Sequence, residues 1–153
     1  MATHLLAVGR KMPAWIQAGF DEYQKRLPAH LKFKVKEFEL SSQASAGARN
    51  RDECRRITAA RPNPALTIAL DARGEQLSTE ALAQRLNQWL QVGRELVFVV
   101  GGPEGLTDEL VQSADARLSL STLTLPHPLV RVILSEQIYR AHSILSGHPY
   151  HRG

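Results

Sequence analysis

Cysteine is nearly absent from this chain: Cys54 is the only one among 153 residues. A single cysteine excludes an internal disulfide and a zinc site built from several thiolates. We expect Cys54 to be an ordinary thiol on the surface of a helix. Because the histidines also lack the spacing of a closed ligand set, the sequence predicts no bound metal.

Long apolar runs are missing as well. No stretch approaches the roughly 18 to 20 apolar residues that a membrane span needs. The opening residues, MATHLLAVGRKMPAW, lack the features of a secretory signal. We therefore expect a cytoplasmic protein that does not contact a membrane. The apolar share of 43% and the charged share of 22% are typical of globular proteins, and the length predicts one domain, residues 1–153.

Positive charge is in modest excess, with a net charge of +4 and a sequence pI near 9.6. Such a balance favours association with polyanions. Part of the excess is local, because ARNRDECRR and the following Arg61 place five arginines between Arg49 and Arg61. This segment is either a contact for nucleic acid or a solvated helix face, and the sequence leaves both interpretations open.

Short apolar strands alternate with amphipathic helices along the whole chain. The predicted strands are His4–Gly9, Phe33–Leu40, Ala65–Asp71, Glu95–Val100 and Ala116–Leu125. The predicted helices are Pro13–Leu27, the arginine-rich segment, Ser78–Leu90, Leu106–Ser113 and Pro126–Leu145. This order predicts an α/β fold, a mainly parallel sheet with helices on both faces. Phe33–Leu40 alternates apolar and charged residues, which is typical of an exposed or edge strand.

In open α/β sheets, ligands bind beyond the carboxyl ends of the strands. Three stretches occupy such positions: the strand end at Leu70, VVGGPEGL (Val99–Leu106) and LSTLTLPHP (Leu120–Pro128). In the second stretch, Gly101 lets a ligand approach the main chain closely, although a sharp structural turn explains the glycines equally well. Glu104 is a candidate base or ligand contact, or an acid in the first turn of a helix.

The stretch before the last helix combines small hydroxyl side chains with apolar ones. Ser121, Thr122 and Thr124 lie where backbone groups and oxygens can recognise a purine edge, while Leu120, Leu123 and Leu125 supply apolar walls. The alternation alone is equally typical of a strand that ends at a proline. The sequence therefore predicts either an adenine pocket or the continuation of a strand.

The last helix carries two apolar stripes on different sides. The first comprises Val130, Leu134, Ile138, Ala141 and Leu145, and the second Leu129, Val132 and Ile133. One stripe can cover the sheet, and the second indicates a partner subunit in a homodimer. Glu136 and Arg140 are spaced to pair on one face. We expect Arg131 on the polar arc of the helix.

The chain ends in GHPYHRG, which is unusually rich in functional side chains. A metal site is disfavoured there because Pro149 interrupts the spacing of the histidines. Tyr150, His151 and Arg152 are better suited to stacking on bases and contacting phosphate in RNA. The competing interpretation is a disordered tail.

The string VVGGPEGL, the later LSLSTLTLPHPLVRVILSEQIYRAHSILSGHPYHR and the opening LLAVGRKMPAWIQAGFDEYQKRLP resemble one family over nearly the whole chain. It is the SPOUT-class ribosomal RNA large subunit methyltransferase H family. The resemblance implies methylation of N3 of a pseudouridine in 23S ribosomal RNA, with S-adenosylmethionine as the methyl donor. It also implies a homodimer and a C-terminal trefoil knot, which no periodicity would predict.

Carried over to this sequence, the resemblance places the cofactor at Leu70, Gly101 and Leu120 through Leu125. Loss of the N3 proton requires a base or a field that favours the anion. The catalytic candidates, which the sequence does not rank, are Glu104, His127, Arg140 and His151. The candidates for substrate binding are Arg131, Arg140, Tyr150, His151 and Arg152.

Three alternatives remain at this level. One is another SPOUT methyltransferase that acts on transfer RNA, and another is a non-catalytic module that binds ribosomal RNA. A flavodoxin-like nucleotide protein is the third, and it predicts affinity for phosphorylated nucleotides. Because the chain offers no separate RNA-binding domain, the expected substrate is 23S ribosomal RNA within the assembled ribosome.

Overall fold

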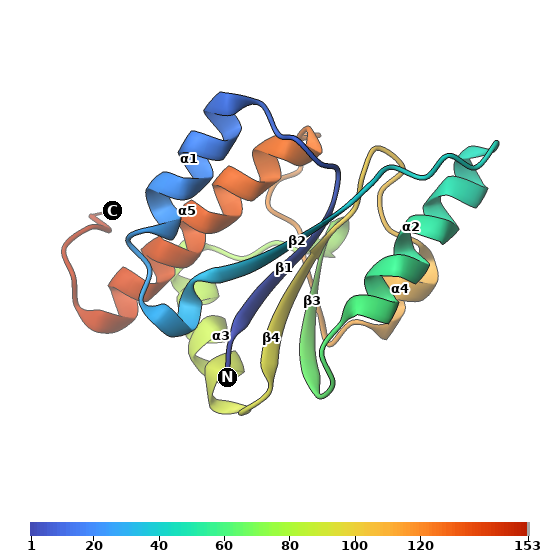
Figure 1. The fold of residues 1–153 in the computed structure, drawn as a ribbon. Helices are drawn as coiled ribbons and strands as arrows, with labels where there is room; N and C mark the ends of the chain where they lie inside the picture. The colour runs from blue at the N-terminus through green and yellow to red at the C-terminus, as the bar shows by residue number, and fades with distance from the viewer. Residues whose placement is uncertain (153) are drawn as a thin grey trace.

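The computed structural model describes residues 1–152 and contains a five-stranded parallel sheet in the order β2-β1-β4-β3-β5 (Figure 1). The strands are β1 (Thr3–Val8), β2 (Phe33–Phe38), β3 (Ala65–Glu75), β4 (Glu95–Val100) and β5 (Ala116–Leu118). The helices are α1 (Ala14–Gln24), α2 (Ala46–Ala60), α3 (Thr79–Gln91), α4 (Asp108–Ser113) and α5 (His127–Ser146), with a 3-10 turn at Ala29–Leu31. The predicted α/β class is confirmed.

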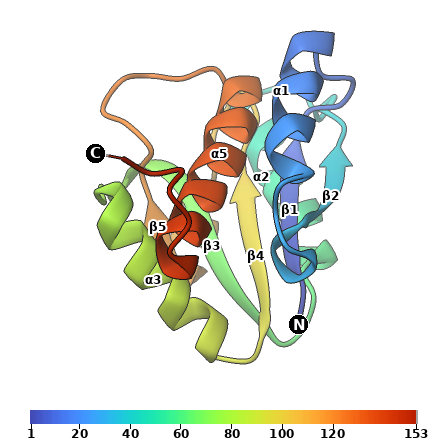
Figure 2. The ribbon, with the colours of Figure 1, turned by 90° about the vertical axis from the view of Figure 1, so that its left-hand side faces the viewer.

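Helices cover both faces of the sheet, as the alternating pattern predicts. Helices α1, α3 and α5 lie on one face, and Figure 2 shows α5 between the other two, whereas α2 and α4 lie on the opposite face. Each layer encloses its own apolar cluster, one containing Phe98 and Leu134 and the other containing Val97 and Ile57. The side chains of β4 point alternately into these two clusters, which explains why the whole strand is apolar.

The order of the strands changes direction at β1. From β1 the chain moves to β2 on one side, and β4 and β3 then fill the other side of β1. In open parallel sheets of this kind, ligands bind beyond the carboxyl ends of the strands. The predicted edge strand is confirmed as β2, which pairs only with β1 among the described strands.

Two expectations about individual segments are wrong. Cys54 is buried in the cluster beneath α2, because that helix turns its cysteine and Ile57 toward the sheet. The last strand ends at Leu118, after which residues 119–126 leave the sheet as a loop rather than continuing as a strand.

Arg131 does not lie on a polar arc. Its side chain is only 4% exposed, pairs with Glu37 of β2, and donates from Nη2 to the carbonyl oxygen of Gly9 at 2.8 Å. The expectation fails because the partner carboxylate is 94 residues away in the chain, beyond the reach of helical periodicity. The first stripe of α5 is buried as predicted at Leu134, Ile138 and Ala141, whereas the second stripe is half-buried.

None of the helices within residues 1–152 combines the length and the apolar character that crossing a membrane requires.

Candidate functional site

A cavity of about 500 Å³ opens beyond the carboxyl ends of β3, β4 and β5. Its size is within the range of pockets that hold small organic ligands. The sequence-predicted residues that line it are Leu70, Gly101, Leu120, Ser121, Leu123, Thr124, Leu125, Glu104 and His127. The three predicted stretches, far apart in the chain, therefore meet at one place. Thr122 is exposed and is not part of the lining.

The glycine-rich loop after β4 is tightly folded on itself. A Cβ atom at Gly101 would lie 2.5 Å from the carbonyl carbon and oxygen of Gly105, and one at Gly102 would lie 2.8 Å from a methyl group of Val8. Gly105 adopts a positive φ of 72° and donates its backbone N–H to the carbonyl of Gly102 at 2.9 Å. The loop therefore needs glycine for its own closure, and this closure presents bare main chain to the cavity.

The loop between β5 and α5 forms the opposite wall. Ser119 donates its hydroxyl to the carbonyl of Ser121 at 3.0 Å, and the backbone N–H of Leu123 donates to Oγ of Ser121 at 2.9 Å. These bonds hold the loop in a turn and engage the Ser121 hydroxyl, which leaves it less free for a ligand than the sequence suggests. Leu123 is 73% exposed, so its side chain is available to a bound molecule or a second chain.

Glu104 of the glycine-rich loop is tied to helix α2. Its Oε1 atom accepts a hydrogen bond from Nη2 of Arg49 at 3.2 Å, and both side chains are about one-third exposed. The ion pair connects the arginine-rich helix with the cavity wall. One member of the basic segment therefore has a specific structural partner at the site.

His127 is the first residue of α5 and lies against the turn after β1. A Cβ atom at Gly9 would lie 2.9 Å from Cε1 of His127, and Nδ1 of the imidazole is buried without a hydrogen-bond partner among residues 1–152. Burial lowers the pKa of His127, the charge of Arg131 lowers it further, and Glu53 opposes the effect only in part. The imidazole is therefore neutral at pH 7.

We expect the His127 imidazole to titrate below 6.5, its ordinary pKa. NMR titration of its Cε1 proton measures the midpoint, with His127→Gln assigning the signal. Because the folded-state pKa lies below that of the unfolded chain, stability is lost as the pH falls below 6.5. The loss should be smaller in the His127→Gln variant. A midpoint at or above 6.5 would contradict the buried environment described here.

Asp71 and Arg73 also line the cavity, and sequence reasoning missed both. Asp71 accepts bonds from Nε and Nη2 of Arg73 at 2.8 and 3.0 Å, and Arg73 also pairs with Asp108 at the start of α4. The bond from Arg73 lowers the pKa of the Asp71 carboxyl, and burial opposes this. The missed signal was a carboxylate directly after a buried strand, in ALDAR, at the edge where ligands bind.

The C-terminal residues form a second cluster on α5. The Tyr150 hydroxyl donates to Oε2 of Glu136 at 2.7 Å, and the Arg140 guanidinium pairs with the same carboxylate and lies 4.6 Å from the centroid of the Tyr150 ring. Burial and the Glu136 carboxylate raise the pKa of Tyr150. Burial alone would raise the pKa of Glu136, yet hydrogen bonds from Tyr150 and Arg140 bring it below its ordinary value.

His151 completes this cluster: Nδ1 lies 3.2 Å from Nη1 of Arg140, and Nε2 lies 3.0 Å from a carboxylate oxygen of Glu80 on α3. Arg152 is exposed and donates from Nε to the carbonyl of Pro149 at 3.1 Å. The tail is thus folded back on α5 and α3, and a disordered tail is excluded for residues 147–152.

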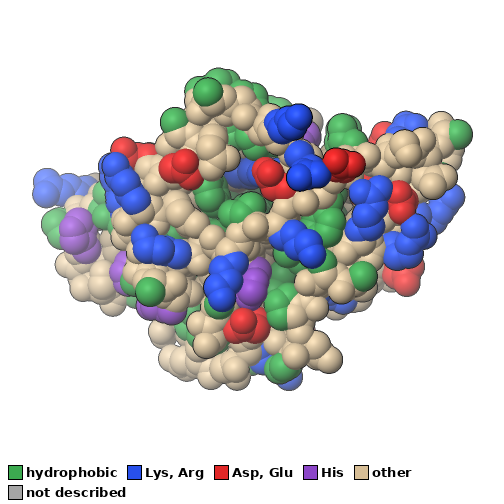
Figure 3. Space-filling model, in the orientation of Figure 1, with side chains coloured by type: hydrophobic (Ala, Val, Ile, Leu, Met, Phe, Trp, Pro, Cys, Tyr) green, Lys and Arg blue, Asp and Glu red, His purple; other side chains and the backbone are tan. Residues whose placement is uncertain are grey.

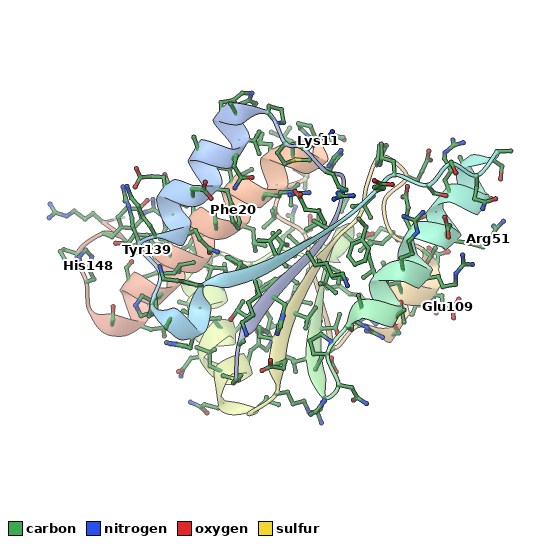
Figure 4. The ribbon with its side chains drawn as sticks, viewed as in Figure 1. Lys11, Phe20, Arg51, Glu109, Tyr139 and His148 are labelled. Carbon is green, nitrogen blue, oxygen red and sulfur yellow. The ribbon has the colours of Figure 1, made fainter. Side chains whose placement is uncertain are left out.

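The two groups of predicted residues do not meet within one protomer. None of the C-terminal residues lines the cavity, and Glu136, which bonds Tyr150, is nine residues from His127, about 13 Å along the axis of α5. Figure 4 labels Tyr139 and His148 near one end of α5 and Lys11 near the other. In residues 1–152, no three His, Cys, Asp or Glu side chains gather as around a metal ion.

Comparison with known proteins assigns this chain to a family. Residues 1–151 match the family described as "Predicted SPOUT methyltransferase". The chain is 49% identical over 151 residues to the ribosomal RNA large subunit methyltransferase H of Bordetella petrii, covering 97% of each chain. It is also 49% identical over 155 residues to the protein of that name from Thioalkalivibrio sulfidiphilus, covering 99% of each. The chain belongs to the SPOUT methyltransferases, in the family of ribosomal RNA large subunit methyltransferase H.

A solved structure supports the fold of this SPOUT methyltransferase. A probable methylase family protein from Haemophilus influenzae superposes with a TM-score of 0.57 at 12% identity, covering 99% of this chain and 70% of the other. At that identity the likeness concerns the fold alone.

Proposed function

We propose that this chain transfers a methyl group from S-adenosylmethionine to N3 of a pseudouridine in large-subunit ribosomal RNA. The observation that carries the proposal is the single cavity in which Leu70, Gly101 and the loop 120–125 come together, in a chain of this family. We further propose that one domain, residues 1–153, acts in the cytoplasm on the assembled ribosome. We also propose that the chain forms the C-terminal trefoil knot of the family, with residues 119–126 as part of the knotted segment.

The cavity suits the proposed cofactor. Leu70, Leu120 and Leu125 provide apolar walls for an adenine ring, while the bare main chain at Gly101 admits polar groups of the cofactor. When bound, S-adenosylmethionine supplies a sulfonium methyl group that is already activated for transfer. The task of the protein is then to align the acceptor, to exclude water and to accept the N3 proton.

Two titratable candidates for proton transfer line the cavity itself. His127 is neutral and accepts a proton without first losing one, whereas Glu104 is engaged by Arg49. Arg140 and His151 belong to the C-terminal cluster, where a guanidinium, an imidazole and a phenol can bind RNA phosphate and stack on a base. Arg131 is held by Glu37 and Gly9, so we assign it to positioning α5 rather than to direct RNA contact.

A homodimer would bring the two clusters together. The second stripe of α5 is only half-buried, and Trp15, Leu123 and Leu145 are exposed apolar side chains, which favours a partner that covers this side of the molecule. In a dimer with two-fold symmetry, the C-terminal cluster of one protomer can face the cavity of the other. We therefore propose that each active site is composed of both subunits.

Methyl transfer to purified large subunits and assembled ribosomes tests the function. Wild-type protein with tritiated S-adenosylmethionine should label the 23S RNA, and mass spectrometry of the digested RNA should place the methyl group on N3 of a pseudouridine. Labelling of transfer RNA alone would identify another SPOUT activity. Failure of calorimetry to detect S-adenosylmethionine binding would leave only the non-catalytic module.

The link between Arg49 and Glu104 predicts a modest effect on cofactor binding. Arg49→Ala should weaken binding of S-adenosylmethionine about threefold, because a partly exposed ion pair contributes up to about 1 kcal/mol to the order of the loop. Arg51→Ala is the matched control, since this exposed arginine of the same helix is labelled in Figure 4. Calorimetry measures both, and equal affinities in the two variants would contradict a role for the ion pair.

A further inference from the structure

A second cavity, of about 440 Å³, lies between β2, the turn after β1 and α1. Its floor is apolar, formed by the buried side chains of Leu5, Ile16 and Phe20. In Figure 3 the face that carries β2 is hollowed above that strand, and a blue side chain lies deep in the hollow. None of the residues that line this cavity lines the first one.

The charge around this second cavity is mainly positive. Arg10, Lys36 and Arg131 contribute cations to its lining, against the single carboxylate of Glu37, which is engaged by Arg131. Arg10 pairs with Glu39 at 2.9 Å, but both side chains are more than half exposed, so a stronger anion can replace this partner. The cavity is therefore complementary to an anionic group.

The surroundings extend the same charge over the surface. Lys34 and Lys36 are exposed on β2, and Figure 3 shows Lys and Arg side chains across this face from β2 to α2. Lys32, just before the strand, is also exposed, and its ammonium donates to the carbonyls of Gln24 and Lys25. The ammonium of Lys36 lies 5.7 Å from the centroid of the Phe38 ring, on the face of the sheet that α2 covers. Because β2 is the edge strand among residues 1–152, this side chain can pass around the edge to reach the cavity. An extended strip of cations is complementary to a polyanionic backbone rather than to a single small ion.

The second cavity is also close to the first. Arg131 lines one and His127 the other, and these residues are one turn apart on α5, about 6 Å along the helix axis. Both contact the turn after β1 at Gly9, His127 through its ring and Arg131 through the carbonyl oxygen. One RNA segment can therefore reach both cavities at once.

We propose that the second cavity binds a phosphate group of the substrate RNA next to the nucleotide that is methylated, with Arg10 and Lys36 as its movable cations. The site rests on the proposed function, because that function supplies the RNA. Arg131 forms the rigid back of the site, and the apolar floor accommodates the sugar or base attached to the phosphate. This site orients the RNA strand relative to the first cavity.

The test compares two double variants that each remove two cations. Arg10→Ala/Lys36→Ala alters the site. Lys25→Ala/Arg94→Ala is the control, because it removes an ion-paired lysine just after α1 and an exposed arginine before β4. Binding to purified large ribosomal subunits is measured over a series of salt concentrations. We expect the first variant to bind at least tenfold more weakly at 0.1 M salt, with a salt slope smaller by about one to two. The control should change less than twofold.

Equal losses in both variants would overturn the proposal, because the effect would then come from overall charge. Titration with uridine monophosphate and with inorganic phosphate distinguishes the source of the anion. One outcome would overturn the RNA site and assign the cavity to a free ligand. In that outcome the wild type binds uridine monophosphate or inorganic phosphate with micromolar affinity, and Arg10→Ala/Lys36→Ala abolishes this binding but binds large subunits as the wild type does. Both variants should bind S-adenosylmethionine as the wild type does. Methylation by the wild type is measured separately, so failure of the proposed function is recognised independently.

Discussion

Replacing Gly101 by alanine should abolish measurable binding of S-adenosylmethionine and lower the free energy of unfolding by roughly 3 kcal/mol. The added Cβ atom would lie 2.5 Å from the backbone of Gly105, and a backbone atom cannot rotate away as a side chain can. The glycine-rich loop must then open, which displaces the main chain that faces the cavity. Urea unfolding gives the stability, and calorimetry gives the affinity.

Gly47→Ala is the matched control for this substitution. Gly47 lies within α2, and a Cβ atom there meets only the flexible guanidinium of Arg51 at 3.2 Å. Alanine in place of glycine should stabilise the helix by up to about 1 kcal/mol and leave the cofactor affinity unchanged. If Gly101→Ala bound S-adenosylmethionine with wild-type affinity, the glycine-rich loop would not form the cofactor site.

Truncation after Ser146 should reduce methylation of the ribosome by at least about a hundredfold while leaving S-adenosylmethionine affinity within about twofold of the wild type. The truncated chain loses Tyr150, His151 and Arg152, none of which lines the cavity of its own protomer, so the cavity should stay intact. Tyr150→Phe is the milder variant, because it removes only the hydrogen bond to Glu136. Retention of full methylation by the truncated chain would mean that the tail has no part in catalysis.

Mixed dimers decide whether the tail acts on its own subunit or on the other. A protomer with its cavity blocked by Thr124→Trp is combined with a truncated protomer, each inactive alone. If the tail acts across the interface, each mixed dimer contains one complete site, and a statistical mixture should recover about one quarter of wild-type activity. If the tail acts within its own subunit, the mixture stays inactive, and the proposal of a composite site is wrong.

The cavity beyond β3, β4 and β5 was predictable from sequence because each of its parts carries a local signal. A buried strand followed by Gly101 and Gly102, and a hydroxyl-rich stretch before a helix, each mark a strand end without knowledge of the rest of the chain. Parallel topology then brings the strand ends to one edge. Asp71 lies one residue beyond Leu70, at the same strand end, and also lines the cavity. The prediction named Leu70 alone at this strand end, although the same rule applies to Asp71.

The failures concern contacts between distant segments. The burial of Arg131 depends on Glu37, and the order of the tail depends on Glu80 of α3, 71 residues before His151. Helical periodicity places a side chain on a face, but it does not reveal which charged group from another element lies opposite. The position of the C-terminal cluster likewise follows from the return of the tail onto Glu136 and Arg140 of α5, and no motif encodes it.

The edges of the sheet restrict how two copies of the chain can associate. An edge strand offers unpaired backbone groups on which a foreign strand can build, and proteins avoid this with lysines or with very short strands. Here β2 carries a row of exposed lysines, and β5 at the other edge is only three residues long. Extension of the sheet from one copy to the next is therefore opposed at both ends. A second copy is left to dock against the helices, whose half-buried apolar side chains lie on α1 and α5.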